Sequence, residues 1–354
     1  MDSALSVDQQ IQKLEEKIVA AKLPQDLLEK INSMLAILKV SLKSGTGNFI
    51  NYESISNYID WVASLPFHLE TQDTMDLNKV KETLDKNHYG LQSVKNNILE
   101  YLSALILNMR VSQSNEVRAP IMCLVGLVGT GKTTLAISIA ESLGRKFERI
   151  PFGGMGDSLA LRGQSRAFSD AEPGLVIKKL AHAASKNSVI LLDELDRVSE
   201  QARADIMGVL VELLDPEQNS AFTDHYIDYP FDLSHVLFIA TANNTTNIST
   251  AVLDRLEIIQ MPSYSDDEKT VIAKQYLFPK IKKESGLSQM QLTIDDSLWP
   301  SIIRPLGYDS GIRSLERTIE TMSRRISRMV VEGKLQANGS FSLTPENIKG
   351  FLPT

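Results

Sequence analysis

Apolar residues recur at helical spacing in the first part of the chain. Three such runs cover residues 11–21, 27–38 and 55–62. Pro24 separates the first run from the second, because proline cannot continue a helix. The polar positions in this part carry no pattern that points to chemistry. We therefore expect residues 1–72 to form a helical bundle or coiled arm without a catalytic role.

Short apolar runs alternate with helical patterns in the middle of the chain. Residues 121–125, 189–192 and 236–240 are apolar and are bounded by polar or glycine residues. Strands that alternate with helices are typical of a parallel α/β sheet. We therefore expect an α/β domain over residues 73–262.

The last part of the chain predicts helices again. Ser265 and Glu268 have the spacing of a capping box, in which each residue satisfies a backbone N–H at the start of a helix. Thr344 followed by Pro345 predicts the start of a final helix, since proline favours the first helical position. We expect a mainly helical domain over residues 263–354.

Composition narrows the class of protein. The chain has 354 residues, of which 43% are hydrophobic and 23% charged, so it can bury a core and is not disordered. Its one cysteine, Cys123, excludes a framework of internal disulfides, and we expect it to be a buried strand residue. The net charge of −7 gives no support for nucleic-acid binding.

Targeting signals and membrane spans are not expected. The longest apolar stretch, residues 121–129, is much shorter than the ~18 residues that a membrane span needs. The first residues have neither the basic nor the apolar region of a secretory signal. We expect a soluble cytoplasmic protein, with an organelle matrix as the alternative.

One glycine-rich segment has the pattern of a P-loop. Residues 126–133 read Gly-Leu-Val-Gly-Thr-Gly-Lys-Thr, after an expected strand and before an apolar-periodic run. Glycines let backbone N–H groups surround phosphate oxygens, and the following helix directs its positive end toward them. In such a loop Lys132 reaches the terminal phosphates and Thr133 ligates magnesium. The segment therefore predicts binding of ATP with Mg²⁺.

Two carboxylates follow the second expected strand. Asp193 can hold magnesium through water, and Glu194 can act as the general base for an attacking water. The alternative is an acidic helix start, because acidic residues favour helix N-termini. About sixty residues after a P-loop, the catalytic interpretation is favoured.

Three further residues are weaker candidates. Asn243 follows the third expected strand and can orient a water molecule, although asparagine is also common in turns. Arg255 and Arg313 can each stabilise charge on a γ-phosphate, although by spacing alone such an arginine more often forms a surface ion pair. Spacing alone leaves these alternatives open.

These elements in this order resemble the AAA+ ATPases, and more closely the ATPase of the Lon protease family. The segments that carry the resemblance include residues 87–95, 214–226 and 311–317. It extends from about Gln9 to Leu352. The resemblance implies the AAA+ P-loop NTPase fold: a parallel α/β sheet with an N-terminal helical arm and a C-terminal, mainly helical lid.

The resemblance also implies a role for each matching residue. The adenine pocket would be lined by Tyr89, Gly90 and Leu91. The phosphates and magnesium would lie against Gly126, Gly129, Thr130, Gly131, Lys132, Thr133 and Thr134, with Asp193 as a further metal residue. Catalysis would use Glu194, Asn243 as the first sensor, Arg313 as the second sensor, and Arg255 as a finger that reaches into the next subunit.

A finger that acts on a neighbour implies a ring, and members of this family are hexamers. Unfolded or damaged proteins are the expected substrates. The Pro-Ser-Ala-Gly segment that carries the family's peptidase serine does not occur. We therefore expect that this chain does not cut peptide bonds by itself. A peptidase would lie outside it, whether the chain is a piece of a longer protein or a natural ATPase without one.

The departures from the family concern the pore loops. The first pore loop has Phe168-Ser169-Asp170, which keeps an aromatic residue but not its apolar neighbour. The second pore region, residues 202–206, lacks its aromatic residue. We therefore expect an unfoldase or translocase with weakened or altered threading of protein. The alternatives are a stand-alone chaperone or remodelling ATPase, or a nucleotide-switched assembly protein.

Overall fold

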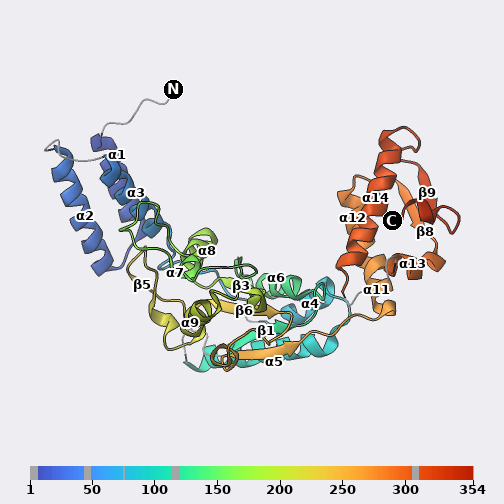
Figure 1. Ribbon diagram of the computed structural model, residues 1–354, viewed down its shortest axis with the longest axis horizontal. Helices are drawn as coiled ribbons and strands as arrows, with labels where there is room; N and C mark the ends of the chain where they lie inside the picture. Colours follow the sequence, from blue (N-terminus) through green and yellow to red (C-terminus); the bar gives the residue numbers. More distant parts are fainter. Residues whose placement is uncertain (1–6, 44–48, 75, 113–119, 305–310, 354) are drawn as a thin grey trace.

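The structure of the chain, a computed structural model, describes residues 7–43, 49–74, 76–112, 120–304 and 311–353. Figure 1 shows an open arc, with a helical arm at one end, a sheet in the middle and the lid at the other end. The predicted boundaries after residues 72 and 262 both fall in segments without helix or strand. The division into three domains at these positions stays a prediction.

The arm consists of the three expected helices. They are α1 (Val7–Ala21), α2 (Gln25–Lys43) and α3 (Phe49–Ser64). Their apolar positions are buried against one another, as the helical spacing predicts. Tyr58 of α3 joins the arm to the middle domain, because its hydroxyl donates to the carbonyl oxygen of Ile227 over 3.1 Å. The guanidinium of Arg166 lies 3.9 Å from the centre of the same ring.

The middle domain contains a five-stranded parallel sheet. The strands are β1 (Ile121–Val125), β2 (Phe147–Pro151), β3 (Val189–Asp193), β6 (Leu237–Ala242) and β7 (Leu256–Gln260). Their order across the sheet is β2-β3-β6-β1-β7. The three predicted strands are therefore confirmed, and β2 and β7 were not predicted because polar residues interrupt both. The carboxyl ends of β1, β3 and β6 lie side by side at one edge of the sheet.

Helices cover both faces of this sheet. Alternate strand residues point to opposite faces, so one face packs on α4 (Leu77–Asn87), α5 (Gln92–Ser112) and α6 (Lys132–Leu143). The other face packs on α7 (Leu159–Arg162), α8 (Leu175–Ala183) and α9 (Arg203–Leu214). Cys123 of β1 is fully buried as predicted, and burial raises the pKa of its thiol to about 12.

Short elements link the larger ones. They are η1 (Leu195–Arg197), η2 (Asn219–Ala221), β4 (Phe222–Thr223), β5 (Pro230–Phe231) and α10 (Thr250–Leu253). Asp224 lies buried after β4 and accepts backbone N–H groups from Gly174, Tyr226 and Ile227 over 2.7–3.0 Å. This segment therefore contributes to packing rather than to the site described below.

The lid is mainly helical. It contains α11 (Asp266–Ile272), the π-helical η3 (Ala273–Leu277), α12 (Phe278–Glu284), η4 (Asp296–Leu298), α13 (Trp299–Ile303), α14 (Arg313–Val331) and η5 (Ile348–Gly350). Two strands, β8 (Gln291–Ile294) and β9 (Ser340–Leu343), form a parallel pair that was not predicted. In the part of the chain that the structure describes, no helix has the length and apolar character of a membrane span.

The two predictions about helix starts in the lid have different outcomes. The capping box of Ser265 and Glu268 is confirmed, since each side chain accepts from the other's backbone N–H. The helix predicted to open at Thr344 is wrong, because this segment is a turn. The side chain of Asn347 accepts from the N–H of Thr344 over 2.9 Å, and such local bonds compete with helix formation.

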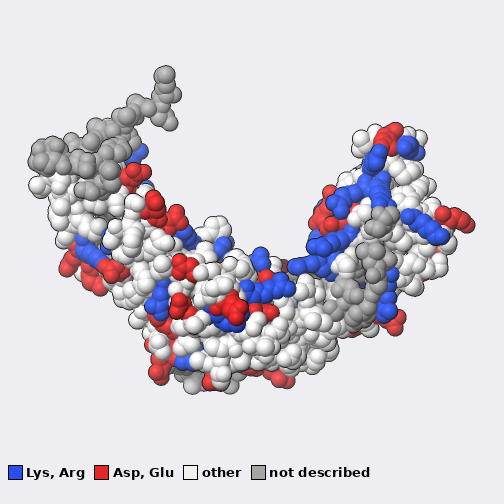
Figure 2. All heavy atoms as spheres, in the orientation of Figure 1, with Lys and Arg blue, Asp and Glu red and all other residues white. Residues whose placement is uncertain are grey.

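Charge is unevenly distributed over the surface. Figure 2 shows Lys and Arg side chains gathered on the lid. Arg317, Arg324 and Arg328 are exposed along α14 at helical spacing. Two carboxylates partly offset them, because Glu316 accepts from Lys280 over 3.3 Å and Glu332 from Arg328 over 2.6 Å. This basic helix face was not predicted from the sequence.

Candidate nucleotide-binding site

The P-loop connects the end of β1 to the start of α6. Gly129 and Gly131 have φ of +84° and +93°, a conformation that side chains with a Cβ rarely adopt. A Cβ on Gly129 would also lie 3.2 Å from the backbone nitrogen of Arg313. The glycine pattern therefore allows both the loop conformation and the close approach of the lid.

Lys132 begins α6 and is buried beneath the loop. Its Nζ donates to the carbonyl oxygens of Gly126 and Leu127 over 2.5 and 3.0 Å, and to Oδ1 of Asn243 over 3.2 Å. Burial lowers the pKa of this amine, and nearby carboxylates, of which Asp196 is the strongest, oppose that effect. The ammonium therefore hydrogen-bonds to carbonyl oxygens of the P-loop itself, and the Lys132 side chain must change conformation to contact a phosphate.

Asp193 ends β3 and is almost fully buried. Its Oδ2 accepts a hydrogen bond from Nε of Arg149 over 2.7 Å and lies 2.6 Å from Nη2 of the same side chain. Its Oδ1 accepts from the hydroxyl of Thr241. Both carboxylate oxygens thus have donors, and the contact with Arg149 was not predicted. The available signal in the sequence was the charged Arg149 within the short segment Phe147–Pro151.

Glu194 follows directly in a left-handed conformation, with φ of +61°. Its N–H donates to Oγ1 of Thr241 over 3.0 Å, and its carboxylate lies 3.3 Å from Nη1 of Arg197. The strained turn directs Glu194 away from the line of β3 and into the cavity described below. This position suits a base that acts on a water molecule beside the loop.

Asn243 follows β6 and is held by the carboxylate of Asp196, which was not predicted as a site residue. Its N–H donates to Oδ1 of Asp196 over 3.0 Å, and its amide nitrogen lies 3.3 Å from Oδ2 of Asp196. The amide oxygen faces Lys132. The third carboxylate in the run that follows β3 was the available signal for Asp196.

These side chains surround a cavity of 290 Å³ at the carboxyl edge of the sheet. Its lining comes from four strands or their ends and from the lid: Val128, Gly129, Gly131, Lys132, Thr133, Thr134, Arg149, Asp193, Glu194, Asn243, Ile312, Arg313 and Glu316. Nine of the predicted site residues therefore lie around one cavity. Gly126 and Thr130 belong to the loop but do not line it.

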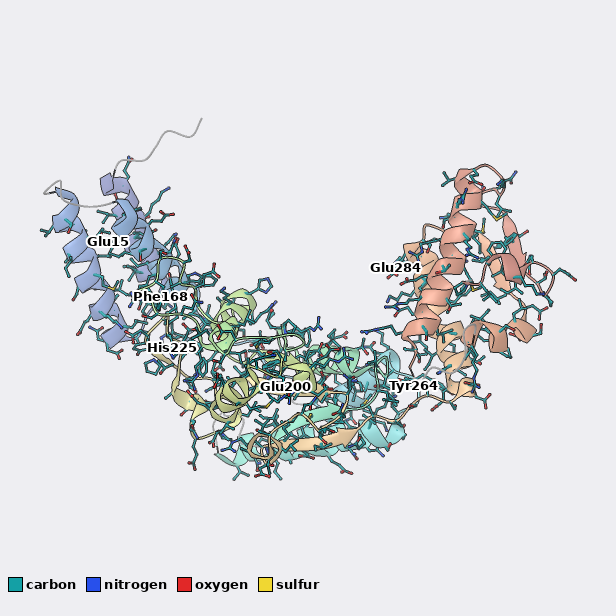
Figure 3. All side chains as sticks on the ribbon, in the orientation of Figure 1. Glu15, Phe168, Glu200, His225, Tyr264 and Glu284 are labelled. Atoms are coloured by element: carbon teal, nitrogen blue, oxygen red, sulfur yellow. The ribbon has the colours of Figure 1, made fainter. Side chains whose placement is uncertain are left out.

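The lid closes one side of the cavity. The N–H of Ile312 donates to the carbonyl oxygen of Gly129 over 3.1 Å, which places Arg313 at the rim. The hydroxyl of Tyr264 lies 3.5 Å from the carbonyl oxygen of Thr130. Figure 3 shows Tyr264 at the junction of the middle domain and the lid. Movement of the lid would therefore move Arg313 relative to the loop.

The predicted adenine residues lie in the turn between α4 and α5 and do not line this cavity. Gly90 and Leu91 have positive φ, and Tyr89 is partly exposed. Their neighbour His88 contacts the hydroxyl of Ser138 on α6 over 2.9 Å. Nζ of Lys95 donates to the carbonyl oxygen of His88 over 2.7 Å. The turn is thus fixed to the helix that carries the P-loop.

Two predicted site residues lie elsewhere. Arg255 donates from Nη2 to Oδ2 of Asp215 over 2.8 Å and does not line the cavity of its own chain. Phe168 follows α7, and 68% of its surface is exposed. Figure 3 shows it on the side of the domain near the arm. Phe168 is exposed, as a pore residue would need to be, whereas only 28% of the Arg255 side chain is exposed.

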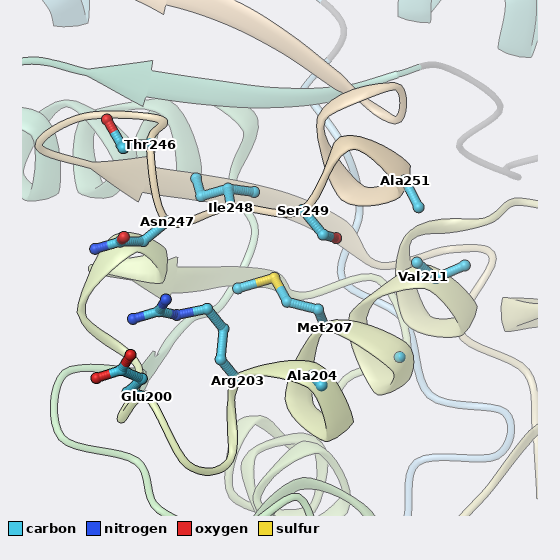
Figure 4. Close-up of a pocket in the computed structure, with 11 residues that line it drawn as sticks. Glu200, Arg203, Ala204, Met207, Val211, Thr246, Asn247, Ile248, Ser249 and Ala251 are labelled. Atoms are coloured by element: carbon cyan, nitrogen blue, oxygen red, sulfur yellow. The ribbon is translucent and has the colours of Figure 1, made fainter.

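A larger, more open depression lies between α9 and the segment before α10. Figure 4 shows Glu200 and Arg203 on one side and Asn247, Ile248 and Ser249 on the other. None of the predicted nucleotide residues lines it. Arg203 and Ala204, which belong to the segment predicted as the second pore region, line it. Its position separates it from the P-loop cavity.

The groups around the P-loop cavity fit a nucleoside triphosphate with magnesium. A loop that accommodates no Cβ at Gly129, followed by a helix N-terminus, suits phosphate oxygens. The hydroxyl of Thr133 and the carboxylate of Asp193 are the hard oxygen donors that Mg²⁺ prefers, and Mg²⁺ commonly takes its remaining ligands from phosphates and water.

Comparison with known proteins agrees with this geometry. Residues 122–264 match the ATPase family associated with various cellular activities (AAA), and residues 283–338 match the Lon protease AAA+ ATPase lid domain. The chain is 40% identical to the Lon protease of Lawsonia intracellularis over 356 residues, 99% of this chain and 41% of that protein. It is 42% identical to the Lon protease of Desulfatibacillum aliphaticivorans over 299 residues, 84% of this chain and 35% of that protein.

The chain thus spans about two fifths of the length of these relatives. The Lon protease of Buchnera aphidicola is 39% identical over 340 residues, 96% of this chain and 42% of that protein. An AAA domain followed by a lid of the Lon type, with this identity along nearly the whole chain, shows that the chain belongs to the Lon protease family as its AAA+ ATPase part.

Proposed function

We propose that this chain binds Mg-ATP at the P-loop cavity and hydrolyses it to drive the unfolding or translocation of protein. The observation that carries the proposal is the meeting of Lys132, Asp193, Glu194 and Asn243 around one cavity, with Arg313 of the lid at its rim. Its relatives are named Lon protease, so a peptidase outside this chain is the expected destination of the polypeptide.

Each residue has a proposed part in hydrolysis. Lys132 would turn from its own loop to the terminal phosphates, and Thr133 and Asp193 would hold Mg²⁺. The ion neutralises charge on the phosphates when it is bound. Glu194 would take the proton of the attacking water, which Asn243 would orient from the next strand. Positioning and charge neutralisation supply most of the rate enhancement in such reactions.

The proposal includes a ring. Arg255 lies outside the cavity of its own chain, which supports action on a neighbouring subunit. A homohexamer follows from the family rather than from any contact described above. In this ring the exposed Phe168 would face the polypeptide, since a flat aromatic side chain provides contact area at low cost in rotamer entropy.

One experiment tests the proposal as a whole. ATP hydrolysis is measured over a range of protein concentrations, with and without an unfolded protein, and Glu194→Gln serves as the blank. We expect turnover per chain to rise with concentration and to rise further with unfolded protein. A hydrolysis rate that unfolded protein does not raise would favour a remodelling ATPase that acts on another substrate. A hydrolysis rate no higher than that of Glu194→Gln at every concentration would contradict the proposal of ATP-driven unfolding or translocation.

A further inference from the structure

Arg149 contacts the carboxylate that the proposed function assigns to magnesium. Its guanidinium reaches Oδ2 of Asp193 through two nitrogens, at 2.7 and 2.6 Å. Both nitrogens face the same carboxylate oxygen, and a hydrogen bond between two charged groups is stronger than one between neutral groups. The other oxygen of Asp193 accepts from Thr241. No oxygen of Asp193 is therefore left without a donor.

The sheet explains why these two side chains meet. Arg149 pairs with Leu191 in the parallel register of β2 and β3, and Asp193 lies two residues farther along β3. Residues two apart on a strand share a face, so Leu191 and Asp193 point to the same side of the sheet, toward α6. A long arginine side chain can reach this diagonal neighbour.

The side chain of Arg149 can also move away from Asp193. β2 is the edge strand of the sheet, and 51% of the Arg149 side chain is exposed, whereas Asp193 is only 6% exposed. The guanidinium can therefore turn into water without burying a charge. Asp193 cannot follow it, because the carboxylate is enclosed by the sheet and held by Thr241.

We propose, on the basis of the function proposed above, that Arg149 is an internal counter-ion that Mg²⁺ must displace from Asp193. Without the ion, Arg149 neutralises the buried carboxylate, while Lys132 is closed on its own loop. The carboxylate that Mg²⁺ would contact is then already paired with a positive group of the protein itself. Because a competitor must leave first, the apparent affinity for Mg²⁺ is lower than the intrinsic affinity.

The test measures binding rather than turnover. A fluorescent, non-hydrolysable ATP analogue is titrated into the full chain in EDTA, and free Mg²⁺ is then titrated at fixed analogue. Arg149→Gln removes the counter-ion. Arg197→Gln is the matched control, because Arg197 also lies beside the acidic pair, is 48% exposed, and contacts Glu194 instead. Both variants lose one positive charge near the site, so their difference isolates the contact with Asp193.

We expect the Mg²⁺ midpoint of Arg149→Gln to lie about three- to tenfold below that of Arg197→Gln, the scale of a charged contact that is half exposed. The affinity for the analogue in EDTA should stay within about twofold of the unmodified chain. Arg149→Lys, which keeps the charge but loses the two-pronged contact, should give an intermediate midpoint. This conservative variant carries the test if Arg149→Gln does not fold, as judged by its circular dichroism.

Two results would overturn the inference. One is a midpoint for Arg149→Gln equal to or above that of the control. The other is a loss of analogue affinity in EDTA larger than any shift of the midpoint, which would make Arg149 a phosphate ligand. Failure of the unmodified chain to bind the analogue with or without Mg²⁺ is a different outcome, because it would overturn the proposed function itself.

Discussion

Arg255 donates from Nη2 to Oδ2 of Asp215 over 2.8 Å, so the proposed finger is bound by a carboxylate of its own chain. The same hydrogen bond is the main cause that lowers the pKa of Asp215 from its usual value. The pair is therefore ionised at neutral pH. Nη1 of Arg255 also donates to the carbonyl oxygen of Ala251 over 2.8 Å. Together these contacts give the guanidinium a defined direction at the surface before any neighbour is present.

Mixing two inactive variants tests whether Arg255 acts on a neighbouring subunit. Arg255→Ala should lower hydrolysis about 10³-fold and retain nucleotide binding. Glu194→Gln should be similarly inactive, because its site lacks the base. Mixed in equal amounts and allowed to exchange subunits, they should recover about one quarter of the unmodified rate. Random assembly places an intact site against an intact finger at one interface in four.

The hydrolysis rate of the mixture decides the point. Each variant alone, at the same total concentration, is the control. A mixture that stays as inactive as its components, although subunit exchange is demonstrated, would contradict action between subunits. It would leave Arg255 with a role in its own chain, through Asp215.

Phe168→Ala tests the pore. The exposed aromatic ring is expected to grip polypeptide, so its loss should reduce the ratio of protein-stimulated to basal hydrolysis at least about threefold. Phe168→Tyr is the control, because it keeps a flat ring and should keep the ratio. An unchanged ratio in Phe168→Ala, together with abolished hydrolysis in Lys132→Ala, would show that Phe168 does not contact the substrate.

Because His88 is buried, we expect the free energy of unfolding to fall at acidic pH. Burial, followed by the charge of Lys95, lowers the pKa of His88 to about 4 from 6.5. The folded chain therefore binds fewer protons than the unfolded chain between these values. The free energy of unfolding should be largest above pH 6.5 and should fall by about 3 kcal/mol toward pH 4 because of this group.

Urea unfolding at pH 7 and pH 4.5 measures this contribution. His88→Gln should reduce the difference in unfolding free energy between the two pH values. His68→Gln, which removes an exposed histidine, should leave the difference unchanged. The attribution to His88 would be wrong if both variants kept the full difference.

The hydrogen bond of Tyr58 is expected to stabilise the packing of the arm on the middle domain. Its ring is fully buried, and its hydroxyl supplies a hydrogen bond to Ile227. Tyr58→Phe leaves that carbonyl oxygen without this donor and should lower the stability of the arm by about 1 kcal/mol. Trp61 of α3 reports on the arm, and Trp299→Phe removes the second tryptophan of the chain.

The measurement is the urea midpoint of Trp61 fluorescence in the Trp299→Phe background. Tyr276→Phe, a matched change in the lid, should leave this midpoint where it is. If Tyr58→Phe also leaves it unchanged, the hydrogen bond between the arm and the middle domain contributes nothing measurable.

The elements that the sequence predicted are those with a local cause. Apolar spacing alone indicates the three arm helices, because burial of one face requires it. The P-loop is equally local, since its glycines, Lys132 and Thr133 stand within eight residues between a strand and a helix. The capping box of Ser265 and Glu268 spans a single turn. The wrong prediction at Thr344 also came from a local signal, the proline that follows it. There the side chain of Asn347 accepts from the N–H of Thr344, and a turn forms instead of a helix.

The sequence by itself thus determined the fold class, the glycine-rich loop between a strand and a helix, and the position of the acidic pair after a strand. Only the tertiary structure decided what those residues contact. Arg149 meets Asp193 across two strands that lie 44 residues apart in the chain. Asp196 holds Asn243 across 47 residues, and Arg255 binds Asp215 across 40. Such partners depend on strand order and register, which arise when the sheet assembles and which no local pattern of residues encodes.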